Sequence, residues 1–144
     1  MEKGRLNINL SIYIIVAFVL SILGQFILSC IFLAFVIFYE KNEQLTRQVL
    51  QPFLMIICYE ILTIVISIFS VFQLVIGLDF IIGMLSIGSI FIVSLVFFVL
   101  NIIGLIQVLS KKYVKIPVFY NLANALYDKV IVNIQNNNSG NNMY

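Results

Sequence analysis

Three long apolar stretches dominate the chain and limit what it can fold into. They cover residues 10–38, 52–76 and 80–110, and Glu60 is the one charged residue inside them. Of the 144 residues, 62% are hydrophobic and 10% are charged, whereas soluble domains carry about 25% charged residues. So few polar side chains cannot cover an apolar core of this size. Lipid is therefore the expected solvent of the folded chain.

The lengths of these stretches predict an all-α, polytopic helical membrane bundle with three to four membrane helices. Each stretch can form a helix that crosses a hydrocarbon layer of roughly 30 Å. The first stretch would make a helix of about 43 Å, which is longer than one crossing needs. It can form one tilted helix or a hairpin that breaks near Gly24 and Gln25. A four-residue spacing of small and polar residues favours the single helix: Ala17, Ser21, Gln25 and Ser29.

Residues 1–132 are expected to form a single membrane domain. Over 118–132, apolar residues recur at three- and four-residue steps with polar residues between them. This pattern predicts an amphipathic helix that lies at the membrane interface. Residues 133–144 are rich in Asn and cannot build a core, so they are predicted to be a disordered tail.

The distribution of basic residues predicts a multi-pass protein of the plasma membrane. Two basic residues lie in the polar segment 39–50, none in the turn 77–79, and four after residue 110. The positive-inside rule places the basic segments, with the C-terminus, in the cytoplasm and the Asp79 turn outside. Because Lys3 and Arg5 make the N-terminus basic too, the first stretch should cross twice, or dip and return. A short head with two bases can also be translocated, so the side of the N-terminus stays open.

Glu60 is the centre of a predicted intramembrane polar site. It shares a helix face with Thr63, Ser67 and Ser70, within an arc of roughly 80°. Asn101 lies at a matching depth in the third stretch, so the two side chains would meet if their helix faces touch. One interpretation is a hydrogen bond that fixes the register of the two helices. The other is a site for a proton, a cation or a cationic substrate.

A cluster of lysines follows the third stretch. Lys111, Lys112 and Lys115 are expected to contact anionic lipid head groups or to dock a partner protein. The charge distribution does not resemble the basic stripe of a nucleic-acid-binding face. The lipid bilayer, other membrane subunits or further copies of this chain are therefore the expected partners.

No arrangement of residues points to catalysis. The chain has no His, and it shows no nucleophile–base pair, paired carboxylates or metal-ligand cluster. We therefore predict a protein that is not an enzyme, with no catalytic residue, no metal and no cofactor.

Two segments resemble a known family. The segment Glu40–Arg47 before a helix resembles the Glu-Lys…Arg-Phe-His-Ala…Gln stretch of small, uncharacterised bacterial membrane proteins, although Val49 and Leu50 stand in place of its His and Ala. The segment Lys112–Pro117 resembles the basic, aromatic, Ile/Leu-Pro segment of the same family. These proteins are similar to the Tic-type import component of the chloroplast inner envelope. The resemblance implies a four-helix membrane domain and, for bacterial members, no defined activity.

Three functions are compatible with these observations. The leading hypothesis is an accessory or assembly subunit of a membrane complex. The second is a transporter or channel component with a proton or cation site at Glu60. The third is a membrane immunity protein against a bacteriocin or toxin.

Overall fold

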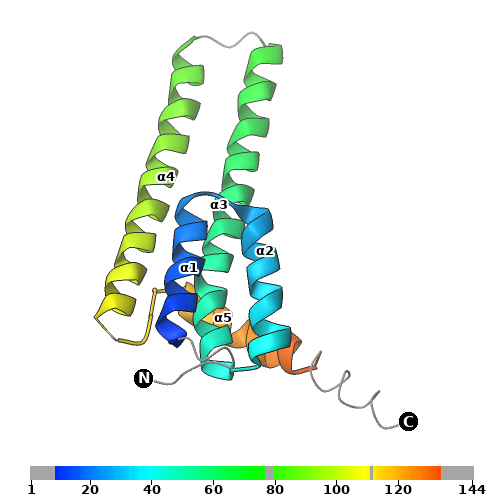
Figure 1. The fold of residues 1–144 in the computed structure, drawn as a ribbon. Helices are drawn as coiled ribbons and strands as arrows, with labels where there is room; N and C mark the ends of the chain where they lie inside the picture. The colour runs from blue at the N-terminus through cyan, green and yellow to red at the C-terminus, as the bar shows by residue number, and fades with distance from the viewer. Residues whose placement is uncertain (1–8, 77–79, 111, 134–144) are drawn as a thin grey trace.

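The computed structural model describes residues 9–76, 80–110 and 112–133, and all its secondary-structure elements are helices. The Asp79 turn, Lys111 and residues 134–144 of the predicted tail lie outside the described residues. Two helices are long and apolar enough to cross a membrane. These are α3 (Glu43–Ile76) and α4 (Phe80–Leu109), which run side by side in opposite directions (Figure 1).

The first apolar stretch forms a short hairpin. Its arms are α1 (Leu10–Ile22) and α2 (Phe26–Phe35), and a π-helical turn, η1 (Val36–Glu40), extends α2. Figure 1 shows the hairpin packed against the half of α3 nearest its start, with its tip midway along α3. The 13 residues of α1 span about 20 Å, which is too short to cross a hydrocarbon layer. Of the two predicted alternatives, the hairpin is therefore correct and the single helix is wrong.

The hairpin breaks at Gly24 because its backbone adopts a left-handed conformation, with φ of +65°. The N–H of Gln25 donates to the Leu20 carbonyl at 3.1 Å, and the N–H of Gly24 donates to the Ser21 carbonyl at 3.2 Å. This pair of bonds is a Schellman motif, which satisfies carbonyls left open at a helix end. The four-residue spacing of small and polar residues favoured the wrong alternative, because side-chain spacing carries no information about this change in backbone conformation.

Replacing Gly24 with Ala should destabilise the hairpin by about 1–2 kcal/mol, since an L-residue is strained in the left-handed region. A Cβ at this position meets no atom within 4 Å, so the loss would come from the backbone alone. Gly24→Asn is the matched control, because Asn tolerates this conformation better. Unfolding in a detergent titration would measure both. Equal stability of wild type and Gly24→Ala would contradict the left-handed turn.

Helix α3 begins earlier than the second apolar stretch predicts. Asn42 caps it, because the Leu45 N–H donates to Asn42 Oδ1 at 3.0 Å. The polar segment before Gln51 is therefore mostly helix, and Pro52 lies well inside α3. The cap therefore starts the helix inside the polar segment 39–50.

The core gathers around the first third of α3. Residues of the hairpin, of α3 and of the end of α4 bury one another there. The largest fully buried side chains in this core include Phe18, Leu45, Leu50 and Met55. Beyond the hairpin tip, α3 and α4 cover only each other, and most of their described apolar side chains are exposed. The structure thus has one packed end and one end made of two helices.

The C-terminal segment crosses the packed end of the bundle (Figure 1). Helix α5 (Phe119–Leu126) continues as a π-helical turn, η2 (Tyr127–Ile131), and residues 132–133 are still helical. Its buried residues recur every fourth position: Phe119, Ala123, Tyr127 and Ile131. This apolar face packs on the core, while Leu122 and Val130 stay exposed.

Candidate functional site

Glu60 lies beside the tip of the hairpin. It lines an open groove of about 520 Å³ between α3 and the start of α2. Gln25 is the other polar side chain in this groove, and the remaining residues are apolar or glycine: Gly24, Phe26, Ile27, Ile57, Ile61 and Ile64. Glu60 is half-buried, and it makes no hydrogen bond or ion pair within the described ranges. The groove therefore presents a carboxylate that can accept a proton, a cation or a hydrogen bond from another molecule.

The hydroxyl groups on the same face of α3 are satisfied within the helix. Thr63 Oγ1 donates to the Tyr59 carbonyl at 2.8 Å, and Ser67 Oγ donates to the Thr63 carbonyl at 2.8 Å. Such bonds to the preceding turn let a hydroxyl face an apolar environment without a second partner. Thr63 and Ser67 thus share the face of Glu60, but they offer no group that is left unbonded.

The structure does not bring Glu60 and Asn101 together. Asn101 lines a different groove, on the side of the hairpin tip where α1 and α4 meet α3. Tyr59 occupies the place predicted for Glu60, because its hydroxyl lies 3.1 Å from Ser94 Oγ on α4. The predicted contact between Glu60 and Asn101 is therefore wrong.

The rotation of α3 has a physical reason. The ring of Tyr59 packs edge-on against Phe97, with ring centroids 5.7 Å apart, and buries more apolar area between the helices than a carboxylate could. The predicted contact required the helix face that carries Glu60, Thr63 and Ser67 to turn toward α4. No such turn is needed, because the hydroxyl groups of this face already donate hydrogen bonds to carbonyl groups of their own helix.

Two of the three predicted lysines, Lys112 and Lys115, follow α4 within the described residues. Lys112 and Lys115 are exposed, and the Lys115 ammonium lies 5.8 Å from the centre of the Tyr120 ring. Their positions leave both ammonium groups able to contact lipid phosphates or a partner protein.

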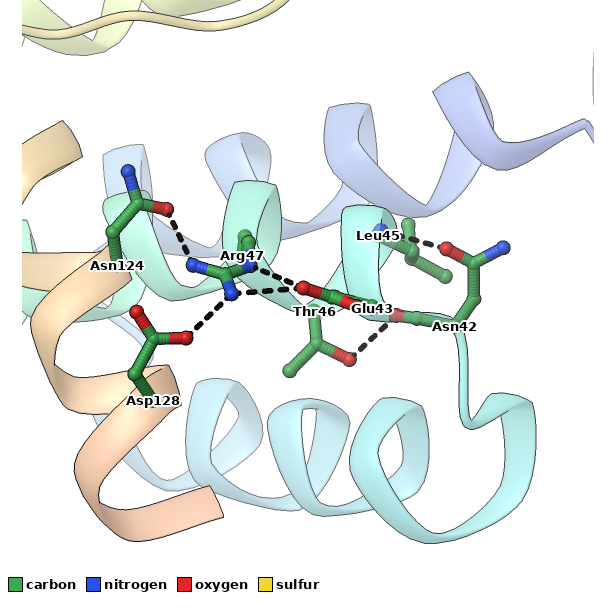
Figure 2. A network of polar contacts seen from close by, with 7 residues as sticks. All are labelled: Asn42, Glu43, Leu45, Thr46, Arg47, Asn124 and Asp128. Carbon is green, nitrogen blue, oxygen red and sulfur yellow. Dashed lines mark hydrogen bonds and ion pairs between the residues drawn. The ribbon is translucent and has the colours of Figure 1, made fainter. Parts of the chain in front are cut away.

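Arg47 joins the start of α3 to the C-terminal segment (Figure 2). Its guanidinium donates to Glu43 at 2.8 Å, to Asp128 at 2.6 Å and to Asn124 at 3.0 Å. The same group lies over the Tyr127 ring, 4.4 Å from its centre. Burial, together with the Glu43 and Asp128 carboxylates, raises the pKa of the Tyr127 hydroxyl, and the Arg47 guanidinium opposes this shift.

Gln51 holds the extended segment 112–116. Its side chain is fully buried, and its amide group bonds in both directions: Nε2 donates to the Val114 carbonyl at 2.9 Å, and Oε1 accepts from the Ile116 N–H at 3.2 Å. On the outside, the Lys115 N–H donates to Gln107 Oε1 at 2.8 Å. Two glutamines from antiparallel helices thus fix this segment against the bundle.

These structural contacts leave partial signals in the sequence. Glu43 and Arg47 stand at the four-residue spacing of a helical ion pair, which marks the start of α3. Asn124 and Asp128 have the same spacing, which places both on one face of the C-terminal helix. No such signal links Gln51 to the segment 112–116, because a contact over 63 residues leaves no periodic pattern.

The described ranges contain no group of three or more Cys, Asp or Glu side chains placed to hold a metal ion. Comparisons of this chain with protein-family models, with curated proteins and with solved structures found no match.

Proposed function

We propose that this protein is a small, non-enzymatic integral membrane protein that acts as an accessory or assembly subunit of a membrane complex. Its helices α3 and α4 have the length and apolar character of membrane spans. In the most apolar 18-residue part of each helix, only 17% of α3 and 11% of α4 is buried within the chain. A core helix of a soluble protein would be mostly covered, so lipid and other membrane helices are the neighbours that suit these surfaces.

The basic residues support an orientation with the packed end in the cytoplasm. Lys41 and Arg47 lie around the start of α3, and Lys112, Lys115 and Lys129 follow the end of α4. The start of α3, the end of α4 and the C-terminal helix lie at the same end of the bundle (Figure 1). The positive-inside rule favours the cytoplasmic side of a plasma membrane for this end. The hairpin then enters the membrane and returns on that side.

Glu60 is the observation that carries the proposal. An unpaired carboxylate among apolar side chains is costly in a membrane, and such residues are usually paired or functional. Its groove is open, and no residue that the structure describes donates a hydrogen bond to the Glu60 carboxylate. A helix of a second membrane chain that carries a Lys, an Arg or an amide would supply this donor. The second chain can be a different subunit or another copy of this one.

Site-specific photo-crosslinking tests this proposal. A photoreactive residue at Ile61, which lines the groove and is 55% exposed, should capture one defined membrane chain in intact membranes. Replacing Glu60 with Leu should lower the yield by at least about tenfold, because a hydrogen bond to a charged group contributes about 1.5–3 kcal/mol. Thr63→Val is the matched control and should leave the yield unchanged, since the Thr63 hydroxyl bonds only within α3. Equal yields from wild type and Glu60→Leu would contradict the proposal.

A second candidate function is a proton or cation path through Glu60. The amide of Gln25 in the same groove favours it, because a carboxylate and an amide together can coordinate a hydrated cation. Glu60→Gln separates the two functions, since it keeps the size and hydrogen bonding of the side chain but removes its charge. A transporter would lose proton or Na⁺ flux in liposomes while its crosslink remained. An accessory subunit would show no flux in either form.

A further inference from the structure

Gln25 is the second polar side chain of the Glu60 groove, and it is available to another molecule. It stands between α1 and α2 at the hairpin tip, where it is exposed. Although it is the residue before α2, its side chain makes no capping hydrogen bond. Within the described ranges, no hydrogen bond joins it to Glu60 or to any other side chain. The groove therefore contains two polar groups that both lack a partner in the chain.

These two side chains are chemically complementary. A carboxylate only accepts hydrogen bonds, and the NH₂ group of a primary amide donates them. If the carboxyl group is protonated, its O–H donates to the amide oxygen while its other oxygen accepts from the NH₂ group, so the pair fits in either state. Unpaired polar groups are costly in lipid. One copy of the chain thus carries both halves of a hydrogen-bonded pair but does not join them.

The position of the two residues allows two copies to complete each other. Because Glu60 and Gln25 line one groove, they lie at a similar height along α3. Most assemblies of identical chains are closed and symmetric, and two-fold dimers are the commonest. A two-fold axis in front of the groove and parallel to α3 leaves every residue at its own height. Glu60 of each copy then faces Gln25 of the other, which gives two equivalent pairs.

The apolar rim of the groove suits the same arrangement. Ile27 at the start of α2 is 73% exposed, and Ile61 and Ile64 on α3 are 55% and 56% exposed. Isoleucines from both sides of the groove are therefore free to pack against a second copy. Lipid tails are as apolar as these side chains, so apolar contact alone does not select a partner in a membrane. The polar pairs supply the selectivity.

We infer that this groove binds a second copy of the chain, in a two-fold dimer joined by two pairs of Glu60 with Gln25. The inference rests on the proposed function and names the partner that the groove takes. A lysine or arginine from a different chain would supply Glu60 with a donor, but it would offer the NH₂ group of Gln25 no acceptor. A second copy satisfies both side chains of both grooves.

Disulfide formation between two different single-cysteine copies tests the dimer in intact membranes. Without Cys30 and Cys58, each chain carries one introduced cysteine, so every disulfide joins two chains. Gln25→Cys co-expressed with Glu60→Cys should form the disulfide far more readily than either variant alone, because only the mixed dimer keeps one pair of Glu60 with Gln25. Leu95→Cys with Gln25→Cys is the matched control and should form none. Leu95 is 53% exposed, and it stands on α4 next to Ser94, which contacts Tyr59.

The affinity of the dimer gives a second test. Gln25→Leu should weaken dimerisation of the full chain in liposomes by about tenfold, since one substitution removes both polar pairs. Energy transfer between two differently labelled copies measures this affinity. The double variant Gln25→Glu with Glu60→Gln exchanges the two groups and should recover most of the wild-type affinity. Unchanged dimerisation of Gln25→Leu would overturn the inference, and so would an equal disulfide yield from the Leu95 control pair.

The mass of the photo-crosslinked product at Ile61 separates a failure of this inference from a failure of the proposed function. A product that contains two copies of this chain supports the dimer. A product that joins this chain to a different membrane chain overturns the dimer but agrees with an accessory subunit. The absence of any crosslinked product contradicts both.

Discussion

Replacing Gln51 with Leu is expected to lower the free energy of unfolding by about 4 kcal/mol. The substitution keeps the apolar volume but removes both bonds to the segment 112–116. The Val114 carbonyl and the Ile116 N–H would then be buried without partners, at about 1–3 kcal/mol each. A detergent-unfolding titration measures the loss, and hydrogen exchange should show reduced protection at the Ile116 amide.

Gln107→Leu is the matched control for Gln51. It removes a bond from the same extended segment, but that bond is exposed and water can replace it. The expected change is within about 0.5 kcal/mol. If the two substitutions destabilised the protein equally, burial would not be the reason for the effect of Gln51.

Replacing Gly104 with Ala is expected to destabilise the protein by about 1–3 kcal/mol, the usual cost of overpacking a core. A Cβ at Gly104 would collide with the ring of Phe18, which is fully buried between α1 and α4. Because Phe18 is fully buried and protein cores are close-packed, the ring or the whole of α1 would have to shift away from α4. Thermal or detergent unfolding of the variant would measure the cost.

Gly88→Ala provides the opposite expectation on the same helix. Its Cβ would meet no atom within 4 Å, so the higher helix propensity of Ala should stabilise α4 by up to about 1 kcal/mol. A second variant, Gly104→Ala combined with Phe18→Leu, should recover part of the lost stability. Loss of stability at Gly88 equal to that at Gly104 would contradict the close approach of α1 and α4.

The helical class and the two long apolar helices follow from the sequence, because hydrophobic composition and stretch length determine both. The start of α3 is harder to read, because the cap at Asn42 and the ion pair at Arg47 act through local geometry rather than hydropathy. The hairpin at Gly24 depends on one backbone conformation, which a spacing rule does not contain.

The candidate site is predictable only in part. The sequence identifies Glu60 as the unusual residue, because a carboxylate in an apolar helix stands out in composition. It does not identify the neighbours of Glu60, because a rotation of α3 by one residue exchanges Glu60 for Tyr59 at the α4 interface. Side-chain volume and ring packing between the two helices determine that rotation, and the pattern of polar residues on one helix cannot predict them.

Cysteine accessibility in sealed membrane vesicles most directly tests the proposed topology, in which the hairpin dips into the membrane and returns. Single cysteines at Lys41, Tyr113 and Leu23, in a background without Cys30 and Cys58, probe the two polar segments and the hairpin tip. A membrane-impermeant maleimide should label Lys41→Cys and Tyr113→Cys from the cytoplasmic side only. Leu23→Cys should react from neither side until detergent is added. Labelling of Leu23→Cys from the outer side, or of Lys41→Cys and Tyr113→Cys from opposite sides, would contradict this account.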